Sequence, residues 1–358
     1  MKLVMTLLAR DEVDMVEAQI SFHLNAGVDF VIATDNRSED GTTDILESYA
    51  REGYLHLIRE QADDRRHGEW FTRMARLAAS DFAADWVINS DADEFWWPRG
   101  GSLKEVLDAV PPRYGIVGAL VRHFPPRSDD ERFFAERMTV RLSARAPIND
   151  PASSFRPFGK IVHRADPRVI VEAGNHGLDG SSFRPLRAWY PIEVLHFPMR
   201  SKDQAERKAV NWIAGTRAPT GSGVIHEGKP NVYHERGYKA HREGQFGKYY
   251  DSIAVDDDAL ERGIADGSFT IDTRLRDALR AIREAPAAEG RLARVGLDFP
   301  QPDLADDAAY AVDVAVLGEA TLVRLQRRLD GFEQRLAGVE RRLLPRIRRR
   351  LLRLAGRG

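Results

Sequence analysis

Strand-like and helix-like segments alternate along the first hundred residues, and this alternation constrains the fold more than any other feature of the chain. Apolar runs of strand length lie at Leu3–Leu8, Phe30–Ala33, Tyr54–Ile58 and Trp86–Asn89. Apolar residues at helical spacing predict helices over Asp14–Ala26, Thr42–Glu52 and Trp70–Ala84. Strands joined by helices through short connections form parallel sheets with right-handed crossovers, so we predict an α/β fold.

The composition is that of a folded protein, with 43% apolar and 30% charged residues in 358. The absence of cysteine excludes disulfides, thiolate metal sites and a cysteine nucleophile. No apolar run reaches the 18 or more residues that would cross a bilayer, and the apolar N-terminal run is too short for a signal peptide. We therefore expect a cytoplasmic protein.

Polar residues follow three of the predicted strands. Arg10–Glu12 comes after the first strand, Asp35–Asp40 after the second and Asp91–Glu94 after the fourth. Ligands of parallel α/β sheets bind outside the carboxyl ends of the strands. We therefore expect these three segments to line one crevice.

The segment Asp91-Ala92-Asp93-Glu94 carries three carboxylates in four residues. Their mutual repulsion is costly unless a cation neutralises it, and Mg²⁺ or Mn²⁺ prefers such oxygen ligands, which it shares with substrate phosphates. The alternative is a solvated acidic turn, which the aromatic run Phe95–Trp97 disfavours. The pattern predicts a metal site at Asp91 and Asp93.

The segment Asp35–Thr42 suits a turn between a strand and a helix whose side chains accept hydrogen bonds from a base or a ribose. It also suits a capping loop, in which Asp40 or Thr42 only caps the helix that follows. Both interpretations are open from the sequence.

In this order, the segments Leu7–Glu12, Asp35–Thr42 and Asp91–Phe95 resemble glycosyltransferase family 2, and more narrowly its bacterial branch with an Asp-x-Asp-Glu-Phe metal motif. The resemblance extends over residues 1–200. It implies a GT-A-type fold, with a mostly parallel central sheet flanked by helices. It also implies inverting transfer of a sugar from a nucleotide-diphosphate donor, with Mn²⁺ or Mg²⁺ as cofactor.

The resemblance assigns roles to individual residues. Asp35 matches the acid that contacts the nucleotide base, and Asp91 and Asp93 match the metal-binding pair, with Asp93 the direct ligand. Arg10 and Asp11 lie where the family contacts the nucleotide, although the usual Pro-x-Tyr lead-in is missing.

Three further basic residues are candidates for the same site. Arg73 and Arg76, on the helix before the fourth strand, could contact the donor diphosphate, or they are ordinary solvated helix residues. His196 lies in a segment that resembles the family's His-aromatic-x-x-basic-Ser run. It could complete the metal shell or contact the diphosphate, and the alternative is a buried core histidine.

An inverting transfer also needs a base beside the acceptor hydroxyl. Asp179 lies where the family places its base, and Glu172 is the second candidate; for each, a structural role is the alternative. Lys160 and His163 could reach the site from their predicted strand.

The C-terminal end has a different pattern. Residues Leu322–Leu343 follow a heptad spacing that predicts a dimeric coiled coil, and the arginine-rich residues 346–357 could lie on anionic lipid at the inner face of the membrane or on an acidic partner. The alternative is a helix that packs on its own domain with solvated arginines. Arg335–Gly358 holds nine arginines and one acidic residue. The nearly neutral total charge therefore combines this basic segment with residues 1–334, whose net charge is −10.

We expect a catalytic domain over 1–200, with a nucleotide-binding half (1–98) and an acceptor-side half (99–200). An extension over 201–318 covers the site, and 319–358 forms a helical tail. The expected acceptor is a glycan, a lipid-linked sugar or a cell-surface polysaccharide precursor, and nucleic acid is not expected.

Three other classes compete with this interpretation. A nucleotidyltransferase carries a glycine-rich loop after its first strand, where this chain has Arg10-Asp11-Glu12, and an aspartate-nucleophile phosphatase carries Asp-x-Asp after its first strand. An inactive adaptor that acts through its coiled tail would not need the carboxylates at Asp91–Glu94.

Overall fold

A computed structural model of the chain describes residues 1–61, 66–128, 131–143, 159–186, 190–217, 232–286 and 290–300. Contacts divide the chain into two compact units, Met1–Tyr310 and Ala311–Gly358. The predicted heptad segment Leu322–Leu343 and the basic segment 346–357 belong to the second unit and lie outside the described residues.

The described residues form one nine-stranded sheet with the order β3-β2-β1-β4-β8-β6-β12-β5, and β11 also pairs with β6. Its strands are β1 (Leu3–Ala9), β2 (Phe30–Asp35), β3 (Leu55–Arg59), β4 (Trp86–Asp91), β5 (Glu94–Pro98), β6 (Ile116–His123), β8 (Gly159–Arg164), β11 (Pro185–Leu186) and β12 (Ile192–His196). Strands β1 to β4 are joined in parallel, as predicted. The pairs β4–β8, β6–β8 and β5–β12 are antiparallel.

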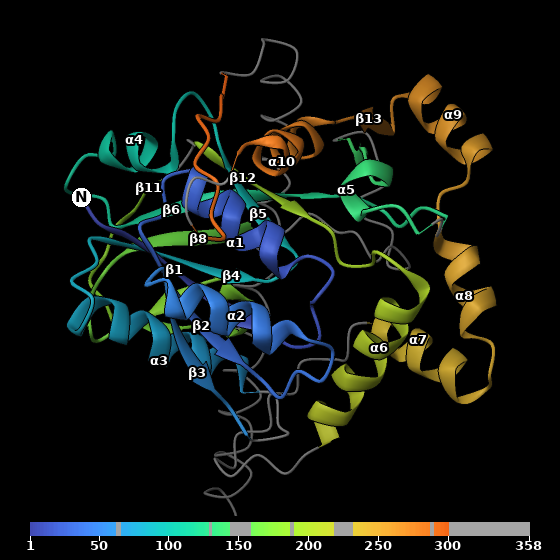
Figure 1. Ribbon diagram of the computed structural model, residues 1–358, viewed down its shortest axis with the longest axis horizontal. Helices are drawn as coiled ribbons and strands as arrows, with labels where there is room; N and C mark the ends of the chain where they lie inside the picture. The colour runs from blue at the N-terminus through green and yellow to red at the C-terminus, as the bar shows by residue number, and fades with distance from the viewer. Residues whose placement is uncertain are drawn as a thin grey trace, which may run out of the picture. The chain divides into compact units, whose positions relative to one another are not determined.

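Helices cover both faces of this sheet (Figure 1). Helices α1 (Val16–Asn25), α2 (Thr42–Arg51), α4 (Leu103–Asp108) and α10 (Arg274–Glu284) contribute to one apolar cluster, and α3 (His67–Ser80) contributes to the other. Strand β1 supplies Leu3, Met5 and Leu7 to the first cluster and Val4 and Leu8 to the second. Because successive side chains of a strand point to opposite faces, burial on both faces explains why β1 reads as a continuous apolar run.

Three helices after β12 form a separate helical arm. They are α6 (Lys202–Arg217), α7 (Val232–Arg242) and α8 (Phe246–Ile253), which lie side by side in Figure 1. The arm has its own small apolar cluster, which includes Ala209, Phe246 and Tyr250. Helix α6 is the first element of this arm.

After the arm, the chain returns to the main body through α9 (Asp257–Asp266) and β13 (Phe269–Ile271). Strand β13 pairs with β7 (Val140–Leu142), which follows the short helix α5 (Phe134–Arg137). Leu275 and Leu279 of α10, and then Phe299, complete the main apolar cluster. No helix in the described ranges is both long enough and apolar enough to span a bilayer.

Candidate active site

The three polar segments that follow β1, β2 and β4 meet at one edge of the sheet. Ala9, the last residue of β1, is in register with Asp35 of β2, and its neighbour Leu8 is in register with Asp91 of β4. The three parallel strands therefore end side by side, as the sequence predicts.

Hydrogen bonds to the carboxylates of Asp35 and Asp40 fix the backbone of the segment after β2. Asp35 is buried, and it accepts a hydrogen bond from the Ser38 backbone N–H at 3.1 Å and another from the Thr43 hydroxyl. Asp40 accepts from the Thr42 backbone N–H at 3.0 Å and from the Val13 backbone N–H at 3.1 Å. The N-cap of α2 is Gly41, which makes no side-chain capping hydrogen bond, so neither Asp40 nor Thr42 occupies the capping position. Asp40 instead accepts from the first backbone N–H of α2, while Asp35 fixes the preceding turn.

The segment after β1 is tied to this turn. Asp11 has a φ of 55°, its backbone N–H donates to Ser38 Oγ at 3.0 Å, and its carboxylate accepts from the Glu39 backbone N–H at 2.8 Å. Arg10 donates to Asn36 Oδ1 at 3.4 Å. Asn211 of α6 donates to the other Asp11 carboxylate oxygen at 3.0 Å, so the helical arm reaches this edge as well.

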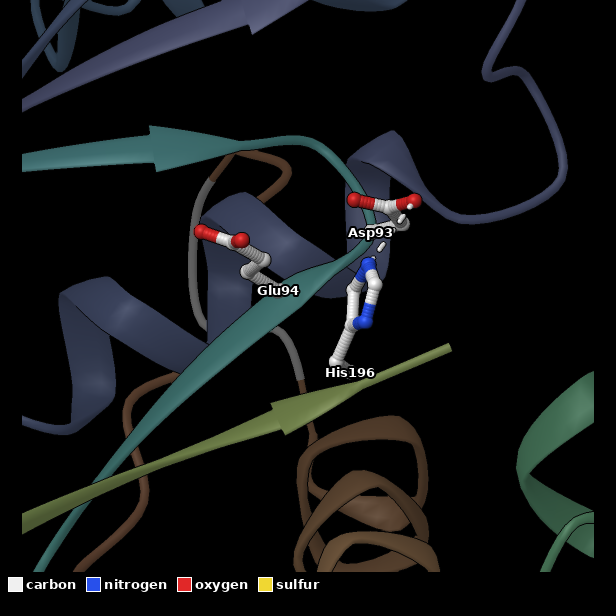
Figure 2. A group of neighbouring side chains, drawn as sticks. All are labelled: Asp93, Glu94 and His196. Carbon is white, nitrogen blue, oxygen red and sulfur yellow. Dashed lines mark ion pairs between the residues drawn. The ribbon is translucent and has the colours of Figure 1, made fainter. Parts of the chain in front are cut away.

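Asp93, Glu94 and His196 form a group in which one possible ligand atom from each residue lies within 4.8 Å of the others. His196 ends β12 and is in register with Glu94, the first residue of β5. Figure 2 shows the imidazole of His196 pointing at the Asp93 carboxylate, with Nε2 3.6 Å from Oδ2. This group contains two of the three predicted metal residues.

Asp91 is not part of that group, and it shares a lysine with Glu94. Lys160 of β8 lies 3.1 Å from Asp91 Oδ2 and 2.6 Å from Glu94 Oε1, with only 3% of its side chain exposed. Burial raises the pKa of Glu94 to about 8, against the opposing effect of Lys160. Burial would also raise the pKa of Asp91, but Lys160 holds it below its usual value. Lys160 is therefore the fixed counter-cation of these two carboxylates.

A second lysine, Lys208 of α6, pairs directly with Asp93. Burial alone would raise the pKa of Asp93, but Lys208 and His196 hold it well below its usual range. Asp93 is therefore a carboxylate anion in a buried position, which is the form that binds a metal ion.

A histidine pair orients the imidazole of this group. His123 Nδ1 lies 3.1 Å from His196 Nδ1, so one of the two nitrogens donates a proton and the other accepts it. When His123 is the donor, the proton of His196 is on Nε2, which faces Asp93 and stabilises its negative charge. When His196 is the donor, Nε2 has no proton and could bind a metal. A hydrogen bond to the ring nitrogen that faces away from the metal commonly fixes the tautomer of a metal-binding histidine.

These donors fit a divalent cation. The two carboxyl groups offer the oxygen ligands that Mn²⁺ and Mg²⁺ prefer, and the carboxylate of Asp93 already carries the charge that a metal would need. A divalent ion at Asp93 would take over the neutralising role that Lys208 has in this structure.

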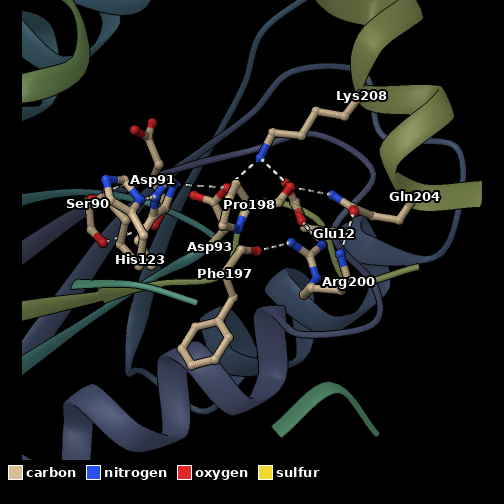
Figure 3. Close-up of polar contacts among 12 residues, drawn as sticks. Glu12, Ser90, Asp91, Asp93, His123, Phe197, Pro198, Arg200, Gln204 and Lys208 are labelled. Atoms are coloured by element: carbon tan, nitrogen blue, oxygen red, sulfur yellow. Dashed lines mark hydrogen bonds and ion pairs between the residues drawn. The ribbon is translucent and has the colours of Figure 1, made fainter. Parts of the chain in front are cut away.

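Arg200 locks the segment after β1 to the segment between β12 and α6 (Figure 3). Its guanidinium is 1% exposed, lies 2.6 and 2.8 Å from the two Asp14 oxygens and also pairs with Glu12. It donates to the Phe197 carbonyl at 3.1 Å. Burial raises the pKa of Glu12 to about 7 even though Arg200 opposes this effect.

Residues 5–178 of the chain match the family model of glycosyltransferase family 92. The matched residues make up just under half of the chain, and the match identifies a glycosyltransferase domain over them. Its mostly parallel sheet flanked by helices is the GT-A-type fold that the resemblance implied. The matched family is number 92, and the kinship with family 2 stays a prediction.

Two solved structures resemble parts of this chain. The crystal structure of S. aureus TarS has 11% sequence identity and a TM-score of 0.32, over 68% of this chain and 43% of that one. Glucosyl-3-phosphoglycerate synthase from Mycobacterium tuberculosis, in complex with Mn²⁺, UDP and its glucosylated product, has 21% identity and a TM-score of 0.24, over 36% of this chain and 44% of that one. The chain thus spans less than half the length of either structure. Among curated proteins, no sequence matches it.

The two predicted arginines of the glycosyltransferase domain have partners away from the acidic group. Arg73 lies 3.2 Å from Glu60, and Arg76 donates to the Val169 carbonyl at 2.8 Å. Both arginines lie beyond the first turn of α3, whereas His67, at its start, is near enough to influence Asp91 electrostatically. The described contacts of the two arginines therefore connect α3 to the residues after β3 and before β9.

The two candidate bases lie on a turn beside α3. Glu172 precedes the short helix η1 (Ala173–Asn175), and Asp179 ends β10 (Leu178–Asp179). Strand β10 returns alongside β9 (Ile170–Val171), so that Asp179 is in register with Ile170. The turn is anchored under β4 by Asn175, which donates to the Asn89 carbonyl at 2.8 Å.

Sequence reasoning did not assign Glu94, Arg200 or Lys208 to the site. Glu94 belongs to the acidic motif itself, so its carboxylate was a visible signal. Arg200 lies in the same segment as His196, but only the fold shows that it meets Glu12. Lys208 is more than a hundred residues from Asp93 and belongs to no motif, so the sequence offered no signal for it.

Proposed function

We propose that this glycosyltransferase transfers a sugar from a nucleotide-diphosphate donor to a glycan or lipid-linked acceptor, with inversion and with Mn²⁺ or Mg²⁺ as its cofactor. The observation that carries the proposal is the convergence of Asp93, Glu94 and His196 at the carboxyl edge of the sheet. The Asp-x-Asp-Glu-Phe pattern supports the same proposal and favours kinship with the bacterial branch of family 2.

In this proposal, Asp93, Glu94 and His196 hold the metal. When bound, the metal would neutralise negative charge on the leaving diphosphate, which lowers the barrier to breaking the sugar–phosphate bond. His123 orients the His196 ring through the 3.1 Å contact between the two Nδ1 atoms. Lys160 keeps Glu94 and Asp91 in place.

The nucleotide would bind over the segments after β1 and β2. Asp35 and Asp11 already hold the backbone of this region through hydrogen bonds to Ser38 and Glu39, so the surface is formed before the donor arrives. A preformed site loses less conformational entropy on binding. Arg10 and Asp91 border the same edge and are proposed to contact the donor.

The acceptor hydroxyl must lose a proton during an inverting transfer, and Glu172 and Asp179 remain the candidate bases. Glu172 lies next to the turn of η1, which contacts α3, and His67 at the start of α3 is near enough to influence Asp91 electrostatically. Asp179 lies on the returning strand, opposite Ile170. This placement favours Glu172. Glu172→Gln should then abolish sugar transfer but leave donor binding intact, while Asp179→Asn should retain transfer; the opposite pattern would assign the base to Asp179.

A panel of nucleotide sugars tests the proposed function. The full chain is incubated with each compound and with Mn²⁺, Mg²⁺ or EDTA, and thermal stabilisation and donor hydrolysis are measured. We expect one nucleotide sugar to raise the melting temperature and to be hydrolysed slowly, in both cases only with metal. Failure of every compound to bind in the presence of Mn²⁺ would contradict the proposal and would favour the adaptor interpretation.

A further inference from the structure

Lys208 occupies an unusual position in the site. It extends from the helical arm to the acidic group, where its ammonium pairs with Asp93 and lies 3.4 Å from the Pro198 carbonyl (Figure 3). The Lys208 side chain is 28% exposed, while that of Asp93 is 5% exposed. The lysine therefore covers a buried carboxylate from the solvent side.

Lys208 and a metal ion would compete for the same carboxylate. Asp93 belongs to the group whose ligand atoms converge within 4.8 Å, and the Lys208 ammonium is in direct contact with it. A divalent cation bound at Asp93 would lie within a few ångströms of that ammonium, and two positive charges at such a distance repel strongly in a buried site. One of the two cations has to move away.

The two lysines of the site differ in their freedom to move. Lys160 is almost completely buried and is held by both Asp91 and Glu94. Lys208 has only Asp93 as a described ion-pair partner, and its flexible four-carbon stem opens to solvent. Lys208 is therefore the cation that can leave.

Its helix, in contrast, is held on both sides of Lys208. Arg200, just before α6, is locked to Asp14 and Glu12, and Asn211, about one turn after Lys208, donates to Asp11 at 3.0 Å. A displaced ammonium would stay near the edge where the donor's phosphates are proposed to bind.

We infer that Lys208 is an exchangeable counter-cation, which neutralises Asp93 in the metal-free protein, gives way to the divalent ion, and then pairs with the diphosphate of the donor. The inference rests on the proposed function and adds a donor-binding residue to it. It predicts opposite effects of one substitution on two ligands, which a purely structural role for Lys208 would not produce.

The experiment uses the full chain with Lys208→Met, which keeps the length of the stem and removes the charge. Calorimetric titration with Mn²⁺ alone should show binding about tenfold or more tighter than in the wild type, because the competing cation is gone. In saturating Mn²⁺, affinity for the best-bound of UDP, GDP, CDP and ADP should fall by about tenfold or more. Lys208→Arg should stay within a few fold of the wild type for both ligands.

Lys202→Met is the matched control, since Lys202 lies on the same helix and pairs with Asp251 outside the acidic group. It should leave both affinities unchanged, and melting temperatures without metal will show that all variants are folded. Equal or weaker Mn²⁺ binding by Lys208→Met would overturn the exchange while leaving the proposed function in place. If neither the wild type nor Lys208→Met binds Mn²⁺, both the exchange and the metal dependence of the proposed function are wrong.

Discussion

His23 of α1 gives a sharp prediction about the pH dependence of folding. Its ring is fully buried, with Nδ1 2.7 Å from the Gln19 carbonyl and Nε2 3.0 Å from the Trp96 backbone N–H. A carbonyl only accepts and an N–H only donates, so both contacts are satisfied by a neutral ring that carries its proton on Nδ1. A second proton on Nε2 would face the Trp96 N–H.

The size of the effect follows from the pKa of this ring. Burial lowers the pKa of His23 from the ordinary 6.5 to about 4. Between these values the unfolded chain binds a proton that the folded chain does not, so the free energy of unfolding falls as the pH falls through this window. At about 1.4 kcal/mol for each pKa unit, the full loss is about 3 kcal/mol, most of it reached by about pH 4.5.

The assay is urea unfolding of the wild type and His23→Gln at a series of pH values from 7 to 4.5. The variant loses hydrogen bonds and should be less stable at pH 7, but its stability should fall by about 2–3 kcal/mol less on acidification than that of the wild type. His56→Gln is the control, because His56 is exposed on β3. Parallel pH profiles for the wild type and His23→Gln would refute the reasoning.

Three further predictions concern other parts of the molecule. Arg200→Met should destabilise the protein by about 3–5 kcal/mol, since it removes one partner of a buried ion pair. A denaturant midpoint close to that of the wild type would show that the ion pairs of Arg200 with Glu12 and Asp14 do not stabilise the fold. Ser102→Ala should cost about 1 kcal/mol in thermal unfolding, because Ser102 and Glu105 form a capping box at the start of α4. Truncation after Gly318 should convert an oligomer to a monomer in sedimentation experiments and weaken binding to anionic liposomes. A full chain that is already monomeric and ignores liposomes would remove both proposed roles of the tail.

The first half of the fold was predictable because its signals are local. Each strand from β1 to β3 is a short apolar run followed by a helix, β4 is a further apolar run, and the polar residues after β1, β2 and β4 mark the carboxyl edge. Strand β5 was not predicted, because its pairing partner β12 comes about a hundred residues later in the chain. The contribution of α10 to the main core also depends on contacts between distant segments.

The site shows the same division between local and distant information. The acidic motif predicted where carboxylates gather, and Asp93 and His196 do converge there. The pairing of Lys160 with Asp91 and Glu94 depends on β8, which pairs antiparallel with β4. The occupation of Asp93 by Lys208 depends on the helical arm. Sequence spacing alone contains neither fact.

The measurement that tests the central claim most directly is turnover of the donor by Asp93→Asn in saturating Mn²⁺. The substitution keeps the shape of the side chain and removes the charge that is proposed to bind the metal. We expect turnover to fall by about a hundredfold or more in a variant that still folds, although with a lower melting temperature, because Lys208 and His196 lose their anionic partner. Asp258→Asn, on the exposed side of α9, should match the wild type. A folded Asp93→Asn that transfers sugar at the wild-type rate would contradict the assignment of this edge of the sheet as the catalytic site.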